Sequence, residues 1–279
     1  MRTRDWDHGY GGGHDAPRFT LGPARVPPIV RTLLIANVAI FVIQVLFSAA
    51  TNVDLERIFG VSHLYLVERL WVWQPFTYMF LHSPTGLMHI AFNMLSLWWF
   101  GSPLEDRLGS RRFLLFYLTA GIVAGLVYAT FAIFDHTFAV PAIGASGAVL
   151  GVVVHLALLD PNRVVLFLML FPIRLKYVAA LLVGIDLFYF LGMQGGGGNV
   201  AHTAHLGGAA YGYLHFRFAG AFHRFFERVE AQAGRDRAKR DVSTREEVDR
   251  LLAKISAEGI GSLTDREKRF LKRSSKRFG

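Results

Sequence analysis

The sequence has no cysteine among its 279 residues. This absence excludes disulfide bonds, thiolate metal sites and a cysteine nucleophile. Charge is also scarce: charged residues make up 18%, below the roughly 25% that is usual in soluble proteins. Hydrophobic residues make up 52%, and the mean hydropathy is +0.34. A chain with this balance is predicted to be a membrane protein that crosses the bilayer several times.

Apolar stretches near the ~20-residue length of a bilayer span recur along the chain. They predict an all-α bundle of six transmembrane helices, at about 32–50, 87–100, 113–134, 146–159, 177–193 and 200–218. The apolar stretch 164–172 contains Pro172, and we expect an interfacial loop there. The first apolar run follows a polar leader, so it is expected to be a retained helix. The predicted domains are a disordered leader (1–30), a membrane domain (31–220) and a basic, helical cytoplasmic tail (221–279).

The basic residues predict the orientation of these spans. The net charge is +9, which in a membrane protein indicates topology and contact with anionic lipid rather than nucleic-acid binding. Lysine and arginine number five before the first span, then 2, 3, 0, 3 and 0 in the connections, and 17 from Arg217 onward. This alternation follows the positive-inside rule and places both termini in the cytoplasm. The second, fourth and sixth spans then all begin on the outer side.

Four polar side chains lie near those three outer ends. Ser146 opens the fourth span, and His205 lies in the first turns of the sixth. A serine hydroxyl is a weak nucleophile that needs an adjacent base, and a histidine supplies one. His89 and Asn93 are four residues apart on the second span, so they share a helix face. With the free N–H groups at the start of the fourth span, their side chains would stabilise an oxyanion.

Glycines close to this pair predict how it is brought together. Gly147-x-x-x-Gly151 follows Ser146, and Gly208-x-x-x-Gly212 follows His205 by one turn. Small residues at this spacing let two helix backbones approach closely. We therefore expect the fourth and sixth spans to pack through these glycines and to set the serine against the histidine.

Other assignments remain open from the residues alone. A Gly-Ala-Ser-Gly string in a membrane helix is usually a packing feature. His202 competes with His205 for the role of base, and Asp186 in the fifth span is a possible third member. We expect a neighbouring helix to satisfy Asp186, and we expect no acid at the depth of His205, which leaves a Ser-His dyad. The remaining histidines are expected to be hydrogen-bonded interfacial residues: His63, His82, His136, His155 and His215.

Three motifs in order resemble those of the rhomboid proteases. They are His89-x-x-x-Asn93, Gly144-Ala145-Ser146-Gly147 and Ala204-His205-Leu206-Gly207-Gly208, and the resemblance covers about residues 30–220. It implies a six-helix core with Ser146 as nucleophile and His205 as base. The oxyanion hole would be formed by His89, Asn93 and the N–H of Ser146. It also implies cleavage of single-span membrane substrates near the outer face, without metal or cofactor, by a multi-pass protein of a bacterial plasma membrane.

Some positions extend the resemblance and others depart from it. Glu105 and Gly109 fit the family pattern. Leu150 stands where many relatives have an aromatic residue that packs on the histidine, and Gln74 stands where some have arginine after the tryptophan. Glycines 195–198 are either a mobile cap over Ser146 or an ordinary flexible connection.

Rival functions follow from the same residues. An inactive rhomboid-like protein that binds membrane clients is the main alternative, although such relatives typically lack the serine or the histidine. A transporter is disfavoured because the predicted spans have no paired intramembrane charges beyond Asp186. In the tail, Gly259-Ile260-Gly261 separates two predicted helices, and both Ser262-x-x-Asp265 and Thr264-x-x-Glu267 are typical of the start of the last helix. We expect the tail to contact anionic lipid or a cytoplasmic partner.

Overall fold

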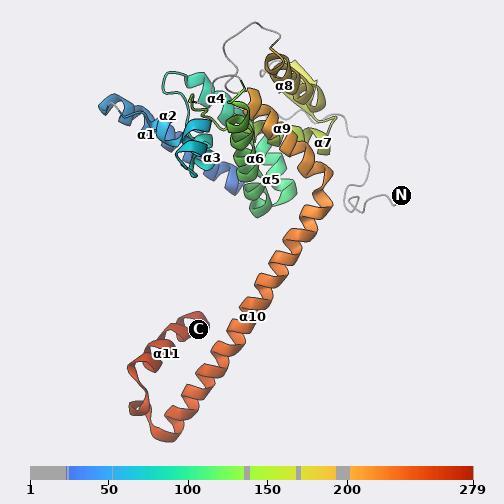
Figure 1. Ribbon diagram of the computed structural model, residues 1–279. Helices are drawn as coiled ribbons and strands as arrows, with labels where there is room; N and C mark the ends of the chain where they lie inside the picture. Colours follow the sequence, from blue (N-terminus) through green and yellow to red (C-terminus); the bar gives the residue numbers. More distant parts are fainter. Residues whose placement is uncertain are drawn as a thin grey trace. The chain divides into compact units, whose positions relative to one another are not determined.

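The computed structural model describes residues 23, 25–51, 53–134, 139–167, 171–192 and 202–278. The chain divides into two compact units, Met1–Arg217 and Phe218–Gly279, close to the predicted boundary of the tail (Figure 1). Most of the predicted leader, His136 and glycines 195–198 lie outside the described residues.

The first unit has a helix at each of the six predicted positions. These helices are α1 (Pro28–Ala50), α4 (Leu87–Ser96), α6 (Ser110–Phe131), α7 (Ser146–Leu159), α8 (Leu175–Phe190) and α9 (His202–Arg217). Shorter elements connect them: α2 (Leu55–Phe59), η1 (Leu64–Glu68), α3 (Gln74–Thr77), η2 (Tyr78–Phe80), η3 (Leu97–Gly101) and α5 (Ser102–Leu108). By length and composition, α1 and α6 are the two described helices that can cross a membrane, while α7 is apolar but shorter. The count of six spans therefore remains a prediction.

The expectation of an all-α fold with an irregular loop at 164–172 is wrong in one place. Strands β1 (Val164–Phe167) and β2 (Phe171–Arg174) form an antiparallel hairpin, in which Val165 lies opposite Ile173. The β-branched residues of this short run favour a strand. Pro172 is tolerated because both strands of a two-stranded sheet are edge strands.

Helices α6, α7 and α9 pack against one another, with the most extensive contact between α7 and α9. Figure 1 shows the ribbons of these helices in the first unit. A Cβ added to Gly147 would lie 2.7 Å from the Cβ of Ala124 on α6. A Cβ added to Gly151 would lie 2.8 Å from the carbonyl oxygen of Gly208 on α9. These contacts leave no room for side chains, which confirms the prediction that the glycine faces of α7 and α9 pack against each other.

Glu105 on α5 ties the start of α1 to the rest of the unit. Its carboxylate accepts hydrogen bonds from the backbone N–H groups of Ile29 (3.0 Å) and Val30 (2.8 Å), and from the Ser110 hydroxyl (2.6 Å). The first N–H groups of a helix have no partner within the helix, and a carboxylate there also faces the positive end of the helix dipole. Glu105 is 2% exposed, so these three donors compensate the burial of its charge.

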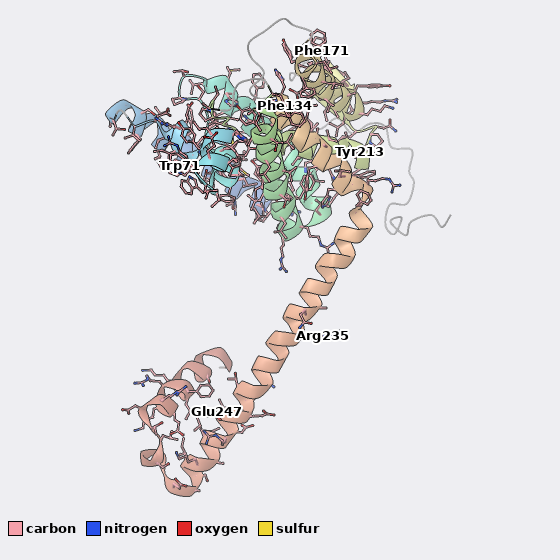
Figure 2. All side chains as sticks on the ribbon, in the orientation of Figure 1. Trp71, Phe134, Phe171, Tyr213, Arg235 and Glu247 are labelled. Atoms are coloured by element: carbon pink, nitrogen blue, oxygen red, sulfur yellow. The ribbon has the colours of Figure 1, made fainter. Side chains whose placement is uncertain are left out.

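Two tryptophans, Trp71 and Trp73, lie in the connection between α1 and α4. Trp71, labelled in Figure 2, stacks between Tyr65 and Trp73 with ring centroids 4.9 and 5.6 Å away. Gln74 is buried, and its amide nitrogen donates to the carbonyl of Arg57 (3.1 Å). The glutamine that departs from the family pattern therefore fixes this connection through a neutral hydrogen bond.

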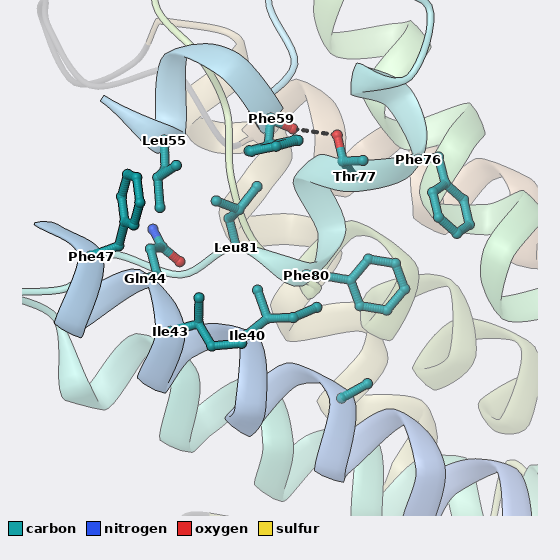
Figure 3. A pocket seen from close by; sticks show the side chains of 11 residues that line it. Ile40, Ile43, Gln44, Phe47, Leu55, Phe59, Phe76, Thr77, Phe80 and Leu81 are labelled. Atoms are coloured by element: carbon teal, nitrogen blue, oxygen red, sulfur yellow. Dashed lines mark hydrogen bonds between the residues drawn. The ribbon is translucent and has the colours of Figure 1, made fainter. Parts of the chain in front are cut away.

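An apolar pocket of about 720 Å³ opens between α1 and the α2–η2 region (Figure 3). Thr77 donates its hydroxyl hydrogen to the carbonyl of Phe59 (2.7 Å) at one side of it. Its lining is otherwise almost entirely apolar, as expected for a surface that faces acyl chains: Ala36, Ile40, Ile43, Gln44, Phe47, Leu55, Phe59, Phe76, Thr77, Phe80 and Leu81. None of the predicted site residues belongs to this lining.

The second unit contains α10 (Ala219–Glu258), η4 (Ile260–Ser262) and α11 (Asp265–Phe278). Gly259 ends α10 with a φ of 82°, as predicted from its position. The Thr264 N–H donates to the Glu267 carboxylate (2.7 Å), while the Glu267 N–H donates to the Thr264 hydroxyl (3.3 Å). This reciprocal pair confirms the predicted helix start.

Candidate active site

Ser146 and His205 come together where α7 and α9 cross. His205 Nε2 lies 2.7 Å from Ser146 Oγ, within hydrogen-bond reach. Ser146 is the first residue of α7, and His205 is the fourth residue of α9. The His205 side chain is 22% exposed, so a substrate can reach Ser146 and His205. The glycine contacts between α7 and α9 keep the two residues close together.

The turn before α7 presents Ser146 to this position. Gly144 has a φ of +120°, a conformation that residues with a Cβ rarely adopt. Its N–H donates to the carbonyl of Tyr78 (2.9 Å), which anchors the turn to η2. Ala145 is the N-cap and carries no capping side chain, so the first N–H groups of α7 are free to bind an acceptor.

His89 on α4 lies beside this turn, and Asn93 lies four residues further along the same helix. A Cβ added to Gly144 would lie 2.8 Å from His89 Nε2 and 3.7 Å from Ser146 Oγ, so glycine allows the imidazole to approach the serine. Asn93 is 5% exposed and donates one amide hydrogen to the His89 carbonyl (2.9 Å). Its second amide hydrogen remains available as a donor.

The prediction that no acid accompanies His205 is wrong. Asp186 on α8 has its Oδ1 2.9 Å from His205 Nδ1, and the same oxygen lies 2.6 Å from His202 Nδ1. The side chain of Asp186 is 8% exposed, and the two imidazoles satisfy its charge. As predicted, a neighbouring helix provides the hydrogen-bond partners of Asp186. That helix is α9, and one of the partners is His205, the histidine that faces Ser146.

The aromatic partner expected four residues after Ser146 is replaced by a different arrangement. Leu150 is buried in α7. On the other side of the site, Tyr189 of α8 stacks on His202, with ring centroids 4.6 Å apart and planes at 4°. His202 in turn meets His205 edge to face at 6.2 Å. The residues that orient His205 therefore come from α8 and from α9 itself.

The other described histidines are mainly packing residues. His63 Nδ1 lies 3.0 Å from the carbonyl of Ala129, and His155 Nδ1 lies 3.1 Å from that of Gly212, which confirms that both are hydrogen-bonded. His82 and His155 are both buried within the first unit, and their expected place at the membrane interface stays a prediction.

A family model of the rhomboid domain matches residues 69–221, more than half of the chain. The chain belongs to the rhomboid family. Rhomboid proteins are integral membrane proteins, and the family includes serine proteases that act within the bilayer. All the residues of the predicted site fall within the rhomboid match. A family of unknown function, DUF6576, matches residues 235–277 in the second unit.

Relatives of this rhomboid chain are found in bacteria and in mitochondria. It is 28% identical over 188 residues to rhomboid protease GluP of Bacillus subtilis (strain 168), which covers 67% of this chain and 34% of GluP. It is 31% identical over 132 residues to the human presenilin-associated rhomboid-like protein, mitochondrial, covering 47% and 34%. It is 38% identical over 60 residues to rhomboid protease GlpG of Salmonella choleraesuis (strain SC-B67), covering 22% and 21%. The chain thus spans about a third of the length of the first two relatives and less of the third.

Proposed function

We propose that this protein is a serine endopeptidase that cleaves transmembrane segments of single-span membrane proteins near the outer face of the bilayer. The proposal includes six spans with both termini in the cytoplasm of a bacterial cell. The observation that carries it is the 2.7 Å separation of His205 Nε2 and Ser146 Oγ. Two relatives named rhomboid protease, GluP and GlpG, come from bacteria, which supports the location in a bacterial plasma membrane.

In the proposed mechanism, Ser146 Oγ attacks the carbonyl carbon of the scissile peptide bond while His205 Nε2 accepts the hydroxyl proton. The tetrahedral intermediate collapses when His205 returns this proton to the leaving amine, and an acyl-enzyme remains on Ser146. Water then attacks the ester with His205 again as base. Proton transfer to a positioned base typically contributes about 10²- to 10⁴-fold to the rate.

The negative oxygen of the intermediate would be stabilised by groups around Gly144. The free N–H of Ser146 lies at the positive end of α7, His89 approaches from α4, and Asn93 has one amide hydrogen to donate. Each such donor is worth about 3 kcal/mol when it is aimed at the developing charge.

Asp186 is assigned a positioning role in this mechanism. A carboxylate oxygen only accepts hydrogen bonds, so it favours the His205 tautomer that carries its hydrogen on Nδ1. That tautomer leaves Nε2 with a free lone pair directed at Ser146 Oγ, which is the state that a base requires. Asp186 also favours the imidazolium that forms when the proton is taken up.

The test is cleavage of a model single-span substrate by the purified protein in liposomes. Wild type is compared with Ser146→Ala, His205→Gln and the control His63→Gln, which changes a histidine bonded only to the Ala129 carbonyl. The expected result is cleavage by wild type and the control, and none by the two site variants. Equal cleavage by all four proteins would refute the role of Ser146. Substrate binding without cleavage by wild type would favour the client-binding alternative.

A further inference from the structure

Asp186, His202 and His205 form a compact set of metal-binding groups behind the serine. Their ligand atoms all lie within 4.8 Å of one another. The two histidines are three residues apart on one face of α9, and the carboxylate comes from α8. Both Nδ1 atoms are directed at the same Asp186 oxygen, at 2.6 and 2.9 Å. Hydrogen-bonding explains this geometry, but two imidazole nitrogens and a carboxylate oxygen are also a common donor set for a transition metal.

We propose that these three residues bind a divalent transition-metal ion of the Zn²⁺ class, and that this ion inhibits the protease. The inference rests on the proposed function for its effect on cleavage, but not for binding itself. Two imidazoles select borderline ions such as Zn²⁺ and Co²⁺ over Mg²⁺ and Ca²⁺, which prefer oxygen ligands.

The site is accessible and largely preorganised. The side chains of His202 and His205 are 19% and 22% exposed, so an ion can reach them. Stacking on Tyr189 holds the ring of His202 in its orientation. Metal–ligand distances of about 2.0 to 2.2 Å place neighbouring tetrahedral ligands about 3.3 Å apart. The Asp186 oxygen, 2.6 and 2.9 Å from the two nitrogens, must therefore move away from them by about 0.4 to 0.7 Å, and the nitrogens, which lie within 4.8 Å of each other, must adjust to the same spacing. Three protein ligands leave a fourth position for water.

The inhibition follows from the tautomer of His205. Without metal, Asp186 accepts the Nδ1 hydrogen of His205, and Nε2 accepts from Ser146. A metal ion on Nδ1 takes that lone pair, so the Nδ1 proton leaves and the neutral imidazole carries a proton on Nε2 instead. The number of protons on the ring is unchanged. Nε2 then donates to Ser146 Oγ and has no lone pair with which to accept the proton of the nucleophile.

Binding is tested directly on full-length protein purified without a polyhistidine tag, in the Ser146→Ala background, so that cleavage does not enter. Zn²⁺ is titrated calorimetrically, and Co²⁺ is followed by its visible absorption. We expect one ion to bind per chain. His202→Asn should weaken binding by at least tenfold, since replacing even a residue that only supports a metal ligand lowers metal affinity about 10- to 100-fold. The control His63→Gln should bind as the parent does.

Inhibition is then measured in liposomes for wild type, His202→Asn and His63→Gln, each relative to its own rate with EDTA. We expect Zn²⁺ to inhibit wild type and His63→Gln, EDTA to reverse this, and His202→Asn to need at least tenfold more Zn²⁺. Zn²⁺ binding that His202→Asn does not weaken, or Zn²⁺ binding without inhibition, would overturn the proposal. Loss of cleavage by wild type in EDTA would instead refute the proposed function, and the calorimetry in Ser146→Ala would still decide whether the metal site exists.

Discussion

Replacement of Gly208 by alanine should separate the two halves of the active site. Gly208 faces Gly147 across the contact between α9 and α7, and a Cβ at position 208 would overlap the Gly147 carbonyl group. The Gly147 carbonyl belongs to the first turn of α7, and a backbone carbonyl in a helix cannot rotate away as a side chain can. Because packed interiors have no spare volume, α9 must move away from α7 by about 1 Å.

The effect on stability and on catalysis can be estimated from this displacement. Inserting a methyl group into a well-packed core usually costs about 1–3 kcal/mol. His205 lies on the same face of α9, one turn before Gly208, so the movement would lengthen its 2.7 Å contact with Ser146 Oγ beyond hydrogen-bond reach. A misplacement of about 1 Å lowers the rate about 10²-fold.

The assay is cleavage of the model substrate in liposomes, combined with denaturation to measure the free energy of unfolding. The matched control is Gly184→Ala on α8, where an added Cβ meets no described atom within 4 Å. Alanine in a helix is more favourable than glycine by up to about 1 kcal/mol, so this control should be as stable as wild type or more so. Its activity should match that of wild type.

Two results would refute the reasoning. If Gly208→Ala cleaves within about threefold of wild type, the contact between α7 and α9 does not set the distance between Ser146 and His205. If Gly184→Ala loses as much activity as Gly208→Ala, the loss arises from added volume in any helix and not from this contact.

Three further predictions test other contacts. Glu105→Gln should lower the free energy of unfolding by about 1.5–3 kcal/mol in denaturation experiments. The reason is that a carboxylate with two acceptor oxygens, one for each of the Ile29 and Val30 N–H groups, is replaced by an amide with one acceptor oxygen. An unchanged free energy of unfolding would contradict the role of Glu105 in capping α1. Asp186→Asn should lower kcat by up to about 10⁴-fold with little change in KM, and a wild-type kcat would show that tautomer control is unimportant. Hydrogen bonds from Thr264 hold the pKa of Glu267 at about 2, below its usual 4.5, so this carboxylate stabilises the start of α11 above pH 4.5 and the effect is lost as the pH falls toward 2. The protection factors of amides at the start of α11, corrected for the intrinsic exchange rate at each pH, should fall across that range in wild type and stay constant in Glu267→Gln. Equal pH dependence of these protection factors in the two proteins would contradict the assignment.

Much of the fold could be predicted because the signals are local. The start of α7 at Ser146 and its end at Leu159 match the prediction, since the glycine turn and Asp160-Pro161 mark the two ends in the sequence. The glycine spacings on α7 and α9 also predicted their contact, because small residues at four-residue intervals point to close helix packing. The hairpin from Val164 to Arg174 was missed, because a short apolar run has no periodicity that separates a strand from a loop.

Sequence motifs were enough to predict which residues would hold the reactive groups and which helix faces would carry them, because motifs and helical periods depend only on neighbours along the chain. The tertiary structure alone decided that Asp186 meets both His202 and His205, and that Glu105 binds the first amides of α1. Those contacts join residues whose separation in the sequence carries no signal of their partnership. They depend on the lateral placement and rotation of whole helices, which packing of the complete unit determines.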